Sequence, residues 1–375
     1  MKNCLIACLL CLSVVAHAQE YNDILRRDTQ VHLADSNLLS FRLDYLGLFK
    51  NNEYFGNFAE GFTLPAWFAQ PRLVYQPGTS TRIEAGAHLL QYFGLQEITQ
   101  VQPIVSFHYR FSPFASVVLG SLYGGTNHRL TEPLYRFERH LEQQLENGVQ
   151  LLTHQPRWES DTWVNWQQFV FASDPFQEQF AFGSTHRFWL TDRDEKLSIL
   201  FHGQLLGQHL GGQINNSPEP VSTIINTSFG TEVTSRWKNP KPGNFGARLL
   251  LYTYNDLEAD TLQAFDRGSA VYISVYGEYA NFGYLAGYWR GTRFVAPYGE
   301  PLFHSISSVQ PELVQEDREL LTLKLFFQKY IRRELRLGVR AEGYFDTMNT
   351  HLDYSASIFM VYQPEFRIGR LAARY

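Results

Sequence analysis

Residues 101–111 read VQPIVSFHYRF, and their alternation indicates the fold class. Its odd positions are apolar or aromatic: Val101, Pro103, Val105, Phe107, Tyr109 and Phe111. Its even positions include polar and charged side chains: Gln102, Ser106, His108 and Arg110. Because successive side chains of a β-strand point to opposite faces, such a strand separates an apolar medium from a wet one. The alternation recurs from about residue 61 to residue 375, and without a long apolar helix it predicts a transmembrane β-barrel.

The first eighteen residues have the form of a secretory signal peptide. Lys2 precedes an apolar run from Leu5 to Val15, and the small-x-small sequence Ala16-His17-Ala18 predicts cleavage before Gln19. This run is too short to span a bilayer, and no later segment approaches the roughly 20 apolar residues that a transmembrane helix needs. All three cysteines lie inside the signal, so we expect no disulfide and no thiol nucleophile in the exported chain.

Composition agrees with export to a membrane but does not establish it. Removing Lys2 lowers the Lys and Arg count from 32 to 31 against 37 Asp and Glu, which gives a formal charge near −6 and does not favour a nucleic-acid partner. Aromatic residues make up 15% of the sequence, with 21 Tyr and 29 Phe, a share that suits girdles at two membrane interfaces. The signal peptide and the alternating strands, rather than composition, lead us to expect the bacterial outer membrane as the location and its lipid as a partner.

The chain divides into the signal peptide (1–18), a polar segment (19–40) and one all-β domain (41–375), an antiparallel barrel of about sixteen strands (14 to 18) with a short helix in one long loop. The polar segment is a periplasmic lead-in or a short plug, and a flexible tail is an equally good interpretation. The expected strands are 42–56, 61–76, 81–93, 98–111, 114–124, 160–172, 178–191, 196–209, 221–237, 243–256, 268–281, 283–293, 318–330, 334–346, 351–362 and 365–375. Turn sequences such as Pro77-Gly78-Thr79-Ser80 and Gln363-Pro364 separate them.

One part of this assignment is inconsistent. Outer-membrane barrels alternate short periplasmic turns with longer outer loops. The long connections expected here, 125–159, 210–220, 257–267 and 294–317, do not all fall at the same end. At least one strand is therefore misassigned or split.

The long insertion at 125–159 is the first candidate for function. Within it, residues 131–148 predict a short amphipathic helix, with Thr131 able to cap it and Gly148 able to end it. Its apolar stripe consists of Leu134, Phe137, Leu141 and Leu145. Such a helix would constrict or cover the mouth of the barrel, or would pack on the rim without gating.

Charged residues on the wet faces of the strands are candidates for lumen selectivity. They are Arg82, Glu84, Arg110, Glu232, Arg236, Arg248, Glu278, Arg336, Arg340 and Glu342. Opposed acids and bases would create a transverse field that selects among polar solutes, or would pair with one another and fill the interior.

A second candidate is the face formed by Trp163, Asn165 and Gln167, which could stack on a sugar ring and hydrogen-bond to it. Interfacial tryptophan beside ordinary lumen polarity explains the same residues. The loop 294–317, which contains His304, is a second possible mouth segment. Because the histidines lack metal-ligand spacing and no phosphate loop or nucleophile elbow occurs, we expect no metal, no cofactor, no catalytic residue and no enzymatic activity.

The chain resembles porin-like outer-membrane barrels of Gram-negative bacteria, of a type without assigned function. The resemblance is most specific at residues 163–169 (WVNWQQF), residues 299–303 (GEPLF) and the terminal residues 371–375 (LAARY). The final aromatic residue resembles the signal by which the barrel-assembly machinery recognises its clients. The resemblance implies that machinery as a partner, but it transfers no catalytic residue.

Three functional hypotheses follow. The first is a porin-like channel or facilitator for small polar or carbohydrate-like solutes. The second is a structural or surface-interaction barrel with an occluded lumen. The third is a barrel hydrolase, which would require a convergent Ser/His/acid or two-carboxylate site at the rim, assembled from separate strands. The oligomeric state is left open.

Overall fold

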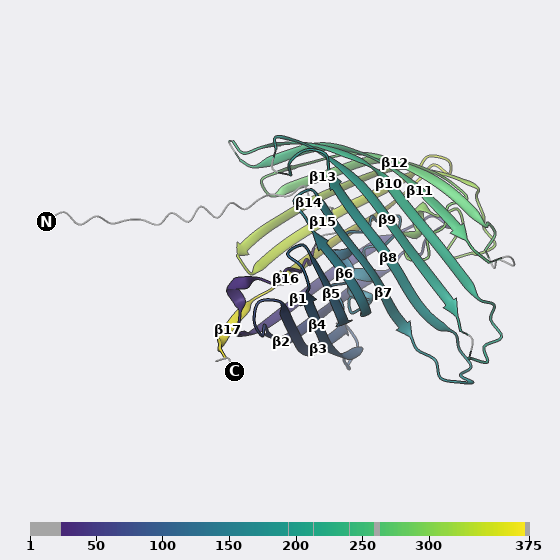
Figure 1. Cartoon of the computed structure of the whole chain (residues 1–375). Helices are drawn as coiled ribbons and strands as arrows, with labels where there is room; N and C mark the ends of the chain where they lie inside the picture. The colour runs from purple at the N-terminus through teal and green to yellow at the C-terminus, as the bar shows by residue number, and fades with distance from the viewer. Residues whose placement is uncertain (1–23, 194, 213, 240, 259–262, 372–375) are drawn as a thin grey trace.

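The protein is a closed antiparallel β-barrel of 16 strands (Figure 1). The computed structural model describes residues 24–193, 195–212, 214–239, 241–258 and 263–371, so the expected signal peptide lies outside the described residues. Among the described residues, no helix is long and apolar enough to cross a membrane.

The strands follow one another around the wall in chain order. They are β1 (Leu38–Glu53), β2 (Thr63–Tyr75), β3 (Thr81–Tyr92), β4 (Gln100–Arg110), β5 (Ala115–Ser121), β6 (Asn147–His154), β7 (Trp158–Gln168), β8 (Glu178–Trp189), β9 (Leu197–Gly211), β10 (Ser222–Trp237), β11 (Gly243–Asp256), β12 (Arg267–Tyr279), β13 (Phe282–Thr292), β14 (Asp317–Arg332), β15 (Leu335–Asp346), β16 (His351–Tyr362) and β17 (Glu365–Arg370). Three 3₁₀ turns, η1 (Leu33–Asp35), η2 (Gly125–His128) and η3 (Pro301–Phe303), and one helical turn, α1 (Arg139–Glu142), complete the described elements.

The barrel closes where β1 meets the end of the chain. β1 pairs antiparallel with β16 over residues 45–53 and with β17 over residues 38–42. Both partners therefore run in the same direction, and β17 continues β16 after an interruption at Gln363 and Pro364. Proline has no N–H to donate to a ladder, which explains a break at this position. The two segments form one strand of the wall.

The expected count of sixteen strands is confirmed, although two errors in the assignment cancel. The ranges 351–362 and 365–375 are one interrupted strand rather than two. β6 was instead expected to be part of the loop 125–159. This strand has only eight residues, and the adjacent apolar pair Leu151 and Leu152 disturbs its alternation.

Once β6 is counted as a strand, the short and the long connections fall at opposite ends of the barrel. Short turns such as 280–281 and 333–334 lie at one end, and the long connections 122–146, 212–221 and 293–316 lie at the other. The long connections now all lie at the same end, so the inconsistency in the expected strand assignment is removed. Because short turns face the periplasm in outer-membrane barrels, we call these the periplasmic end and the outer end.

The alternation of side chains is regular along the wall. In β15, Leu337 and Val339 are 41% and 48% exposed on the outer face, whereas Arg340 and Glu342 are buried in the interior. An apolar face toward lipid and a polar face toward the lumen are the pattern expected of a barrel in a membrane.

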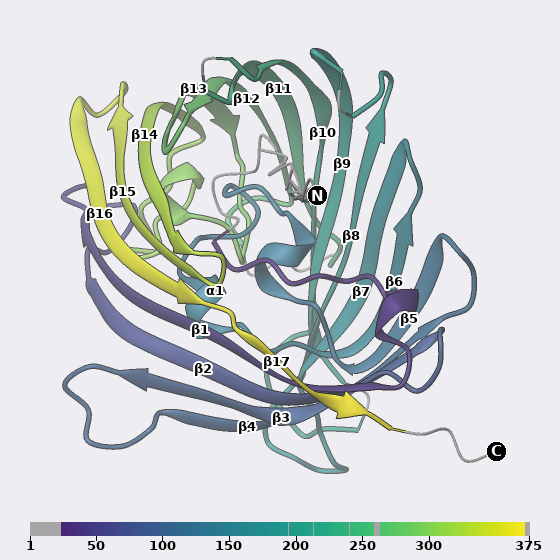
Figure 2. The same ribbon diagram turned by 90° about the vertical axis from the view of Figure 1, so that its left-hand side faces the viewer.

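Chain segments occupy the lumen. Residues 24–31 cross it, and the insertion 122–146 between β5 and β6 folds inward beside them (Figure 2). Ile24 and Leu25 are 1% exposed, and Leu134, Phe137 and Leu141 of the insertion are equally buried. The apolar stripe of the insertion therefore faces the interior of the barrel.

The helix expected at 131–148 is wrong in extent, because the only helical turn there is α1, four residues long. Around Thr131, whose carbonyl accepts hydrogen bonds from the backbone N–H of Leu134 (2.9 Å) and Tyr135 (2.9 Å), the chain forms turns. Glu132 and Glu138 bind lysines on the wall, so their side chains hold this segment in an irregular path. Residues 147 and 148 belong to β6.

Candidate functional site

A buried charge network fixes the insertion to the wall at the centre of the lumen. Lys50 of β1 lies 2.5 Å from Glu138 of the insertion, measured from Nζ to Oε1. Lys324 of β14 contacts Glu132 of the insertion and lies 3.0 Å from Glu342 of β15. All five side chains are buried. Because removing one partner of a buried ion pair costs about 3–5 kcal/mol, this network is a structural anchor.

Several of the charges predicted to line a pore pair with one another. Arg340 lies 2.7 Å from Glu342, and Arg248 lies 2.8 Å from Glu232. His202 lies 3.3 Å from the same carboxylate of Glu232. The paired, space-filling arrangement is therefore the better description of these residues.

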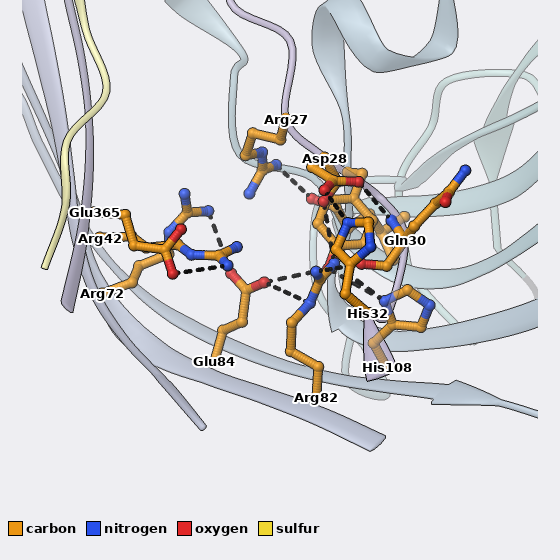
Figure 3. A network of polar contacts seen from close by, with 12 residues as sticks. Arg27, Asp28, Gln30, His32, Arg42, Arg72, Arg82, Glu84, His108 and Glu365 are labelled. Atoms are coloured by element: carbon orange, nitrogen blue, oxygen red, sulfur yellow. Dashed lines mark hydrogen bonds and ion pairs between the residues drawn. The ribbon is translucent and has the colours of Figure 1, made fainter. Parts of the chain in front are cut away.

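A second network holds the N-terminal segment (Figure 3). The Arg82 side chain lies 3.4 Å from Glu84 and donates a hydrogen bond of 2.9 Å to the backbone carbonyl of Gln30. Arg72 lies 3.4 Å from Glu84 on its other side. The backbone N–H of Arg27 donates to Asn127 of the insertion at 3.2 Å. The N-terminal segment is thus bound both to the wall and to the insertion.

The remaining predicted charges lie toward the periplasmic end. Each makes a local contact: Arg110 with the Thr79 carbonyl (2.7 Å), Arg236 with the Arg193 carbonyl (3.2 Å), Arg336 with the Ile24 carbonyl, and Glu278 with the Asn244 amide (3.0 Å). The structure therefore does not gather the predicted residues into one site.

The predicted sugar-stacking face of Trp163 is covered by the protein itself. The His128 ring lies 3.5 Å from the Trp163 ring at 9°. Asn165 accepts a hydrogen bond from the backbone N–H of Asn147 at 3.0 Å, and Gln167 accepts one from the hydroxyl of Tyr298 at 3.0 Å. These contacts correct the expectation, because an inward-facing ring beside the insertion has no face left for a solute.

His128 is held between two carboxylates. Its Nδ1 lies 2.8 Å from Asp161, and its Nε2 lies 3.1 Å from Glu146. Burial alone would lower the pKa of His128, but these two carboxylates outweigh burial and raise the pKa to about 10. The ring is therefore a buried cation with both nitrogens engaged.

A different arrangement lies on the outer face of the wall, near the outer end. Trp166, Phe180, His209 and Thr223 belong to β7, β8, β9 and β10, and each stands directly opposite the next in the strand register. The rings of Trp166 and Phe180 stack at 5.1 Å, and those of Phe180 and His209 lie 4.7 Å apart. We call these four residues the rim row.

At one end of the rim row, the Thr223 hydroxyl is within hydrogen-bond reach of an imidazole nitrogen and a carboxylate oxygen. Thr223 Oγ1 is 2.9 Å from His209 Nδ1 and 3.2 Å from Glu258 Oε1, in the connection after β11. A hydroxyl within hydrogen-bond reach of an imidazole and a carboxylate is the arrangement of an activated nucleophile. The group resembles the Ser/His/acid site that a barrel hydrolase requires at its rim, with threonine in place of serine and with the acid on the hydroxyl rather than on the imidazole.

Glycines shape the wall around this group. A Cβ atom at Gly211 would lie 2.9 Å from His209 Nε2, so the absence of a side chain makes room for the imidazole. The Phe182 ring likewise occupies the space that a side chain at Gly207 would fill. Phe182, Gly207 and Ile225 stand opposite one another in the register, so the wall just below the rim row is apolar.

Another hydroxyl and histidine, Ser184 and His186, lie 3.0 Å apart on the outer face of β8. Ser184 is four residues from both Phe180 and Phe188, which is roughly 13 Å along the strand in either direction. The pair therefore lies midway between the aromatic residues at the two interfaces, in the hydrocarbon rather than at the level of lipid ester groups. The rim row lies at the outer interface and is the better candidate.

A cleft opens on the lumen side of the same strands. It has a volume of about 410 Å³ and is lined in part by Gln208 and Ser222, by Arg136 of the insertion, and by His304 of the loop 293–316. Arg136 also lies 2.8 Å from Glu142. Among the described residues, no group of three or more His, Cys, Asp or Glu side chains is arranged to hold a metal ion.

Sequence reasoning missed the rim row because its residues come from four strands and share no local motif. His209 and Thr223 do belong to one hairpin, so correct pairing of β9 with β10 would have brought them together. The register was not readable, because the connection 212–221 is too long to fix it.

Comparisons with known proteins identify both a family and a fold. A family model described as "Lipid A 3'-O-deacylase-type" matches residues 31–371. A loop-deletion mutant of OmpT, an outer membrane protein of Vibrio cholerae, has a TM-score of 0.51 at 12% identity, covering 87% of this chain and 99% of that chain. The outer membrane protein OpdK from Pseudomonas aeruginosa has a TM-score of 0.50 at 9% identity, with coverage of 88% and 100%. The comparison with curated proteins gave no match.

These matches confirm an outer-membrane barrel of the porin-like type. They also correct one expectation, because a deacylase family is a family of enzymes and the prediction that the chain is not an enzyme is wrong. At identities of 12% and 9%, the solved structures show the fold alone.

Proposed function

Because the chain belongs to the lipid A 3'-O-deacylase-type family, we propose that it hydrolyses an acyl ester of a lipid A-like glycolipid in the outer leaflet. The observation that carries the proposal is the position of Thr223, with His209 and Glu258, on the outer face of the wall. Aromatic residues mark the membrane interface in barrels, and ester groups of lipids lie at that level. The rim row would therefore meet its substrate without removing it from the membrane.

In this proposal, Thr223 Oγ1 attacks the ester carbonyl while its proton passes to His209 Nδ1. The carbon–oxygen bond to the sugar then breaks, and the proton passes from His209 to the sugar oxygen, which leaves as an alcohol. Water activated by the same imidazole hydrolyses the acyl-threonine and releases the fatty acid. Nucleophile and base in hydrogen-bond contact are the geometric requirement for such covalent catalysis.

Glu258 and the apolar wall would have supporting roles. The Thr223 hydroxyl donates its single proton to Glu258 at 3.2 Å, and on substrate binding it would turn that proton to His209 Nδ1 at 2.9 Å. The acyl chain would lie along Phe182, Gly207 and Ile225, which continue the outer face toward the membrane interior. The ester would then reach the hydroxyl while its chain remained in hydrocarbon.

The test uses the full barrel in vesicles that contain lipopolysaccharide, with mass spectrometry of released fatty acid and of the residual lipid A. Thr223→Val removes the hydroxyl and retains the shape, and we expect fatty-acid release to fall at least about 100-fold. Thr231→Val, on the outer face of the same strand, is the matched control and should keep full activity. Absence of fatty-acid release by the unaltered barrel would overturn the proposed function.

A second candidate function is passage of a small polar solute. The cleft of about 410 Å³ at the outer end favours it, because its lining includes Arg136, Gln208 and Ser222. Arg136 would then meet the solute directly, and the buried charges predicted for the lumen, such as Arg82 and Glu342, would act only through their electric field because other residues engage them. Conductance across planar bilayers, compared before and after deletion of residues 131–146, tests this function. A non-conducting barrel in both forms would argue against it.

We also propose that residues 1–18 are cleaved on export, that the segment 19–40 acts as a plug, and that the barrel-assembly machinery inserts the chain. The apolar run before Ala18 supports cleavage, and the burial of Ile24 and Leu25 supports a plug. The mass of the N-terminal peptide from purified outer membranes tests cleavage directly. A mature chain that starts at Met1 would contradict it.

A further inference from the structure

The wall carries a second register row on its outer face, near the periplasmic end. Phe245, Gly277, Tyr284, Leu325 and Ala341 belong to β11, β12, β13, β14 and β15, and each stands directly opposite the next. A groove of about 560 Å³ runs over this row, and we call it the lower groove. It is separate from the rim row and takes no part in the proposed hydrolysis.

The groove is recessed because small residues form its floor and aromatic residues lie beside them. Gly277 has no side chain, and the Tyr284 ring leans across it so that a Cβ atom there would lie only 2.8 Å away. Ala341 keeps the far side shallow. Trp237 and Phe327 also line the groove. The resulting surface is concave and mainly apolar, with Asn244 and Glu278 as the polar residues of its lining, in a wall that faces the bilayer.

Hydrocarbon must fill such a groove. A concave surface toward lipid that remained empty would lose dispersion contacts along its whole length. In a bilayer, packing of this kind rather than exclusion of water drives association. The natural occupant is therefore a lipid acyl chain, and the position at the periplasmic end selects a lipid of the inner leaflet of the outer membrane.

Charge at the periplasmic end indicates which head group accompanies that chain. The turn after Trp237 contains Lys238 and Lys241, both exposed. Lys329 and Arg332 at the end of β14 and Arg333 in the turn that follows it are also exposed. The acidic residue in these two turns is Glu334. Basic groups beside an apolar surface at a membrane face recognise anionic lipid head groups.

We propose that the lower groove binds one anionic phospholipid, with an acyl chain over Gly277 and Ala341 and the phosphate at the basic turns. Phosphatidylglycerol and cardiolipin have this chemistry. The acyl chain supplies contact area, and the lysines at 238 and 241 supply preference for the charged head group. At about 1 kcal/mol for each basic residue near a membrane surface, each lysine contributes a preference of about fivefold.

The test is electron spin resonance of the full barrel in vesicles of phosphatidylethanolamine that contain a chain-labelled phospholipid. We expect a motionally restricted component that is larger for labelled phosphatidylglycerol than for labelled phosphatidylcholine. Because lipids on the rest of the wall also contribute to this component, Ala341→Phe, which fills the groove, should reduce it and remove the excess for labelled phosphatidylglycerol. Ala85→Phe, on the outer face of β3, is the matched control and should leave it unchanged.

The head-group contribution is tested separately. Lys238→Ser with Lys241→Ser should reduce the preference for phosphatidylglycerol by about fivefold for each lysine and retain the restricted component, whereas Lys196→Ser in another periplasmic turn should change neither. Competition by millimolar glycerol 3-phosphate would show a site for phosphate alone and would overturn the acyl-chain proposal. Equal signals for the two lipids in the unaltered barrel would overturn the anionic preference. Because no variant touches the rim row, fatty-acid release should be unaffected throughout.

Discussion

Two histidines in this barrel stand beside aromatic rings, yet their surroundings give them opposite roles. His128 lies inside the lumen with each ring nitrogen on a carboxylate. His209 lies on the outer face, where its Nδ1 meets the hydroxyl of Thr223 at 2.9 Å. A buried histidine with both nitrogens engaged by carboxylates has no atom left for a substrate, whereas one beside a hydroxyl at the membrane interface can exchange a proton. Both residues are histidines, so their different roles follow from the chemistry of their partners and from their positions in the barrel.

The largest expected effect is on the rim histidine. His209→Gln removes the base for Thr223 and should lower fatty-acid release by about 10²–10⁴-fold. The barrel should remain folded, because this side chain lies on the surface of the wall. Release of fatty acid from lipopolysaccharide vesicles measures the activity, and heat-modifiable gel migration checks folding. Activity within threefold of the unaltered protein would show that His209 is not the catalytic base.

Removing the interior histidine should have the converse result. His128→Leu leaves the carboxylates of Glu146 and Asp161 buried without their cation, which should destabilise the barrel by about 3–5 kcal/mol. Activity per folded molecule should stay unchanged. Urea unfolding in vesicles gives the first quantity, and fatty-acid release normalised to the folded fraction gives the second. A stable barrel without activity would assign His128 to catalysis instead.

A smaller effect should follow from crowding His209 while leaving it in place. Gly211→Val introduces a Cβ atom 2.9 Å from His209 Nε2, which should displace the ring and reduce fatty-acid release about tenfold. Gly203→Ala on the same strand is the control, since its Cβ atom would meet only an ordinary contact at 3.8 Å from His186. Equal losses in the two variants would indicate a general effect of altering β9.

A graded form of the loss expected for His128→Leu should come from pH. The pKa of His128 is raised to about 10 in the folded barrel, above the ordinary value of 6.5, because Glu146 and Asp161 outweigh the opposing effect of burial. A group with a raised pKa in the folded state contributes stability that is complete below about pH 6.5 and is lost as the pH rises through about 10. The unfolding free energy of the unaltered barrel should therefore fall toward that of His128→Leu between these limits. Parallel pH profiles for the two proteins would contradict the assignment.

The fold was predictable because the wall has an apolar outer face and a polar inner face, so apolar and polar residues alternate along each strand. Residues 101–111 illustrate this, since β4 occupies nearly the same range. The errors have local causes: Pro364 divides one strand into two apparent strands, and the adjacent Leu151 and Leu152 conceal β6. The lumen contents were less predictable, because Glu132 and Glu138 bend the insertion toward Lys324 and Lys50, which are distant in sequence.

The site was harder to predict than the fold for a physical reason. The inward charges repeat along single strands, so a pattern search finds them. Arg82, Glu84, Arg248, Glu232, Arg340 and Glu342 form pairs that fill space, and the others contact carbonyl or amide groups. The rim row is perpendicular to the strands and depends on register, which one sequence does not specify. Trp163 and Trp166 show the difference, since three positions along β7 place one ring against His128 and the other on the membrane face.

The contact between Arg27 and Asn127 has a consequence for the way the molecule is assembled. It joins a segment near the start of the chain to an insertion that lies between β5 and β6, and both are enclosed by the wall. The seam of that wall joins β1 to β16 and β17, the last strands to be synthesised. A segment so enclosed is most simply positioned before the ring closes. The wall would then close around the N-terminal segment and the insertion, and the pairing of β1 with β16 and β17 would be the final step of folding.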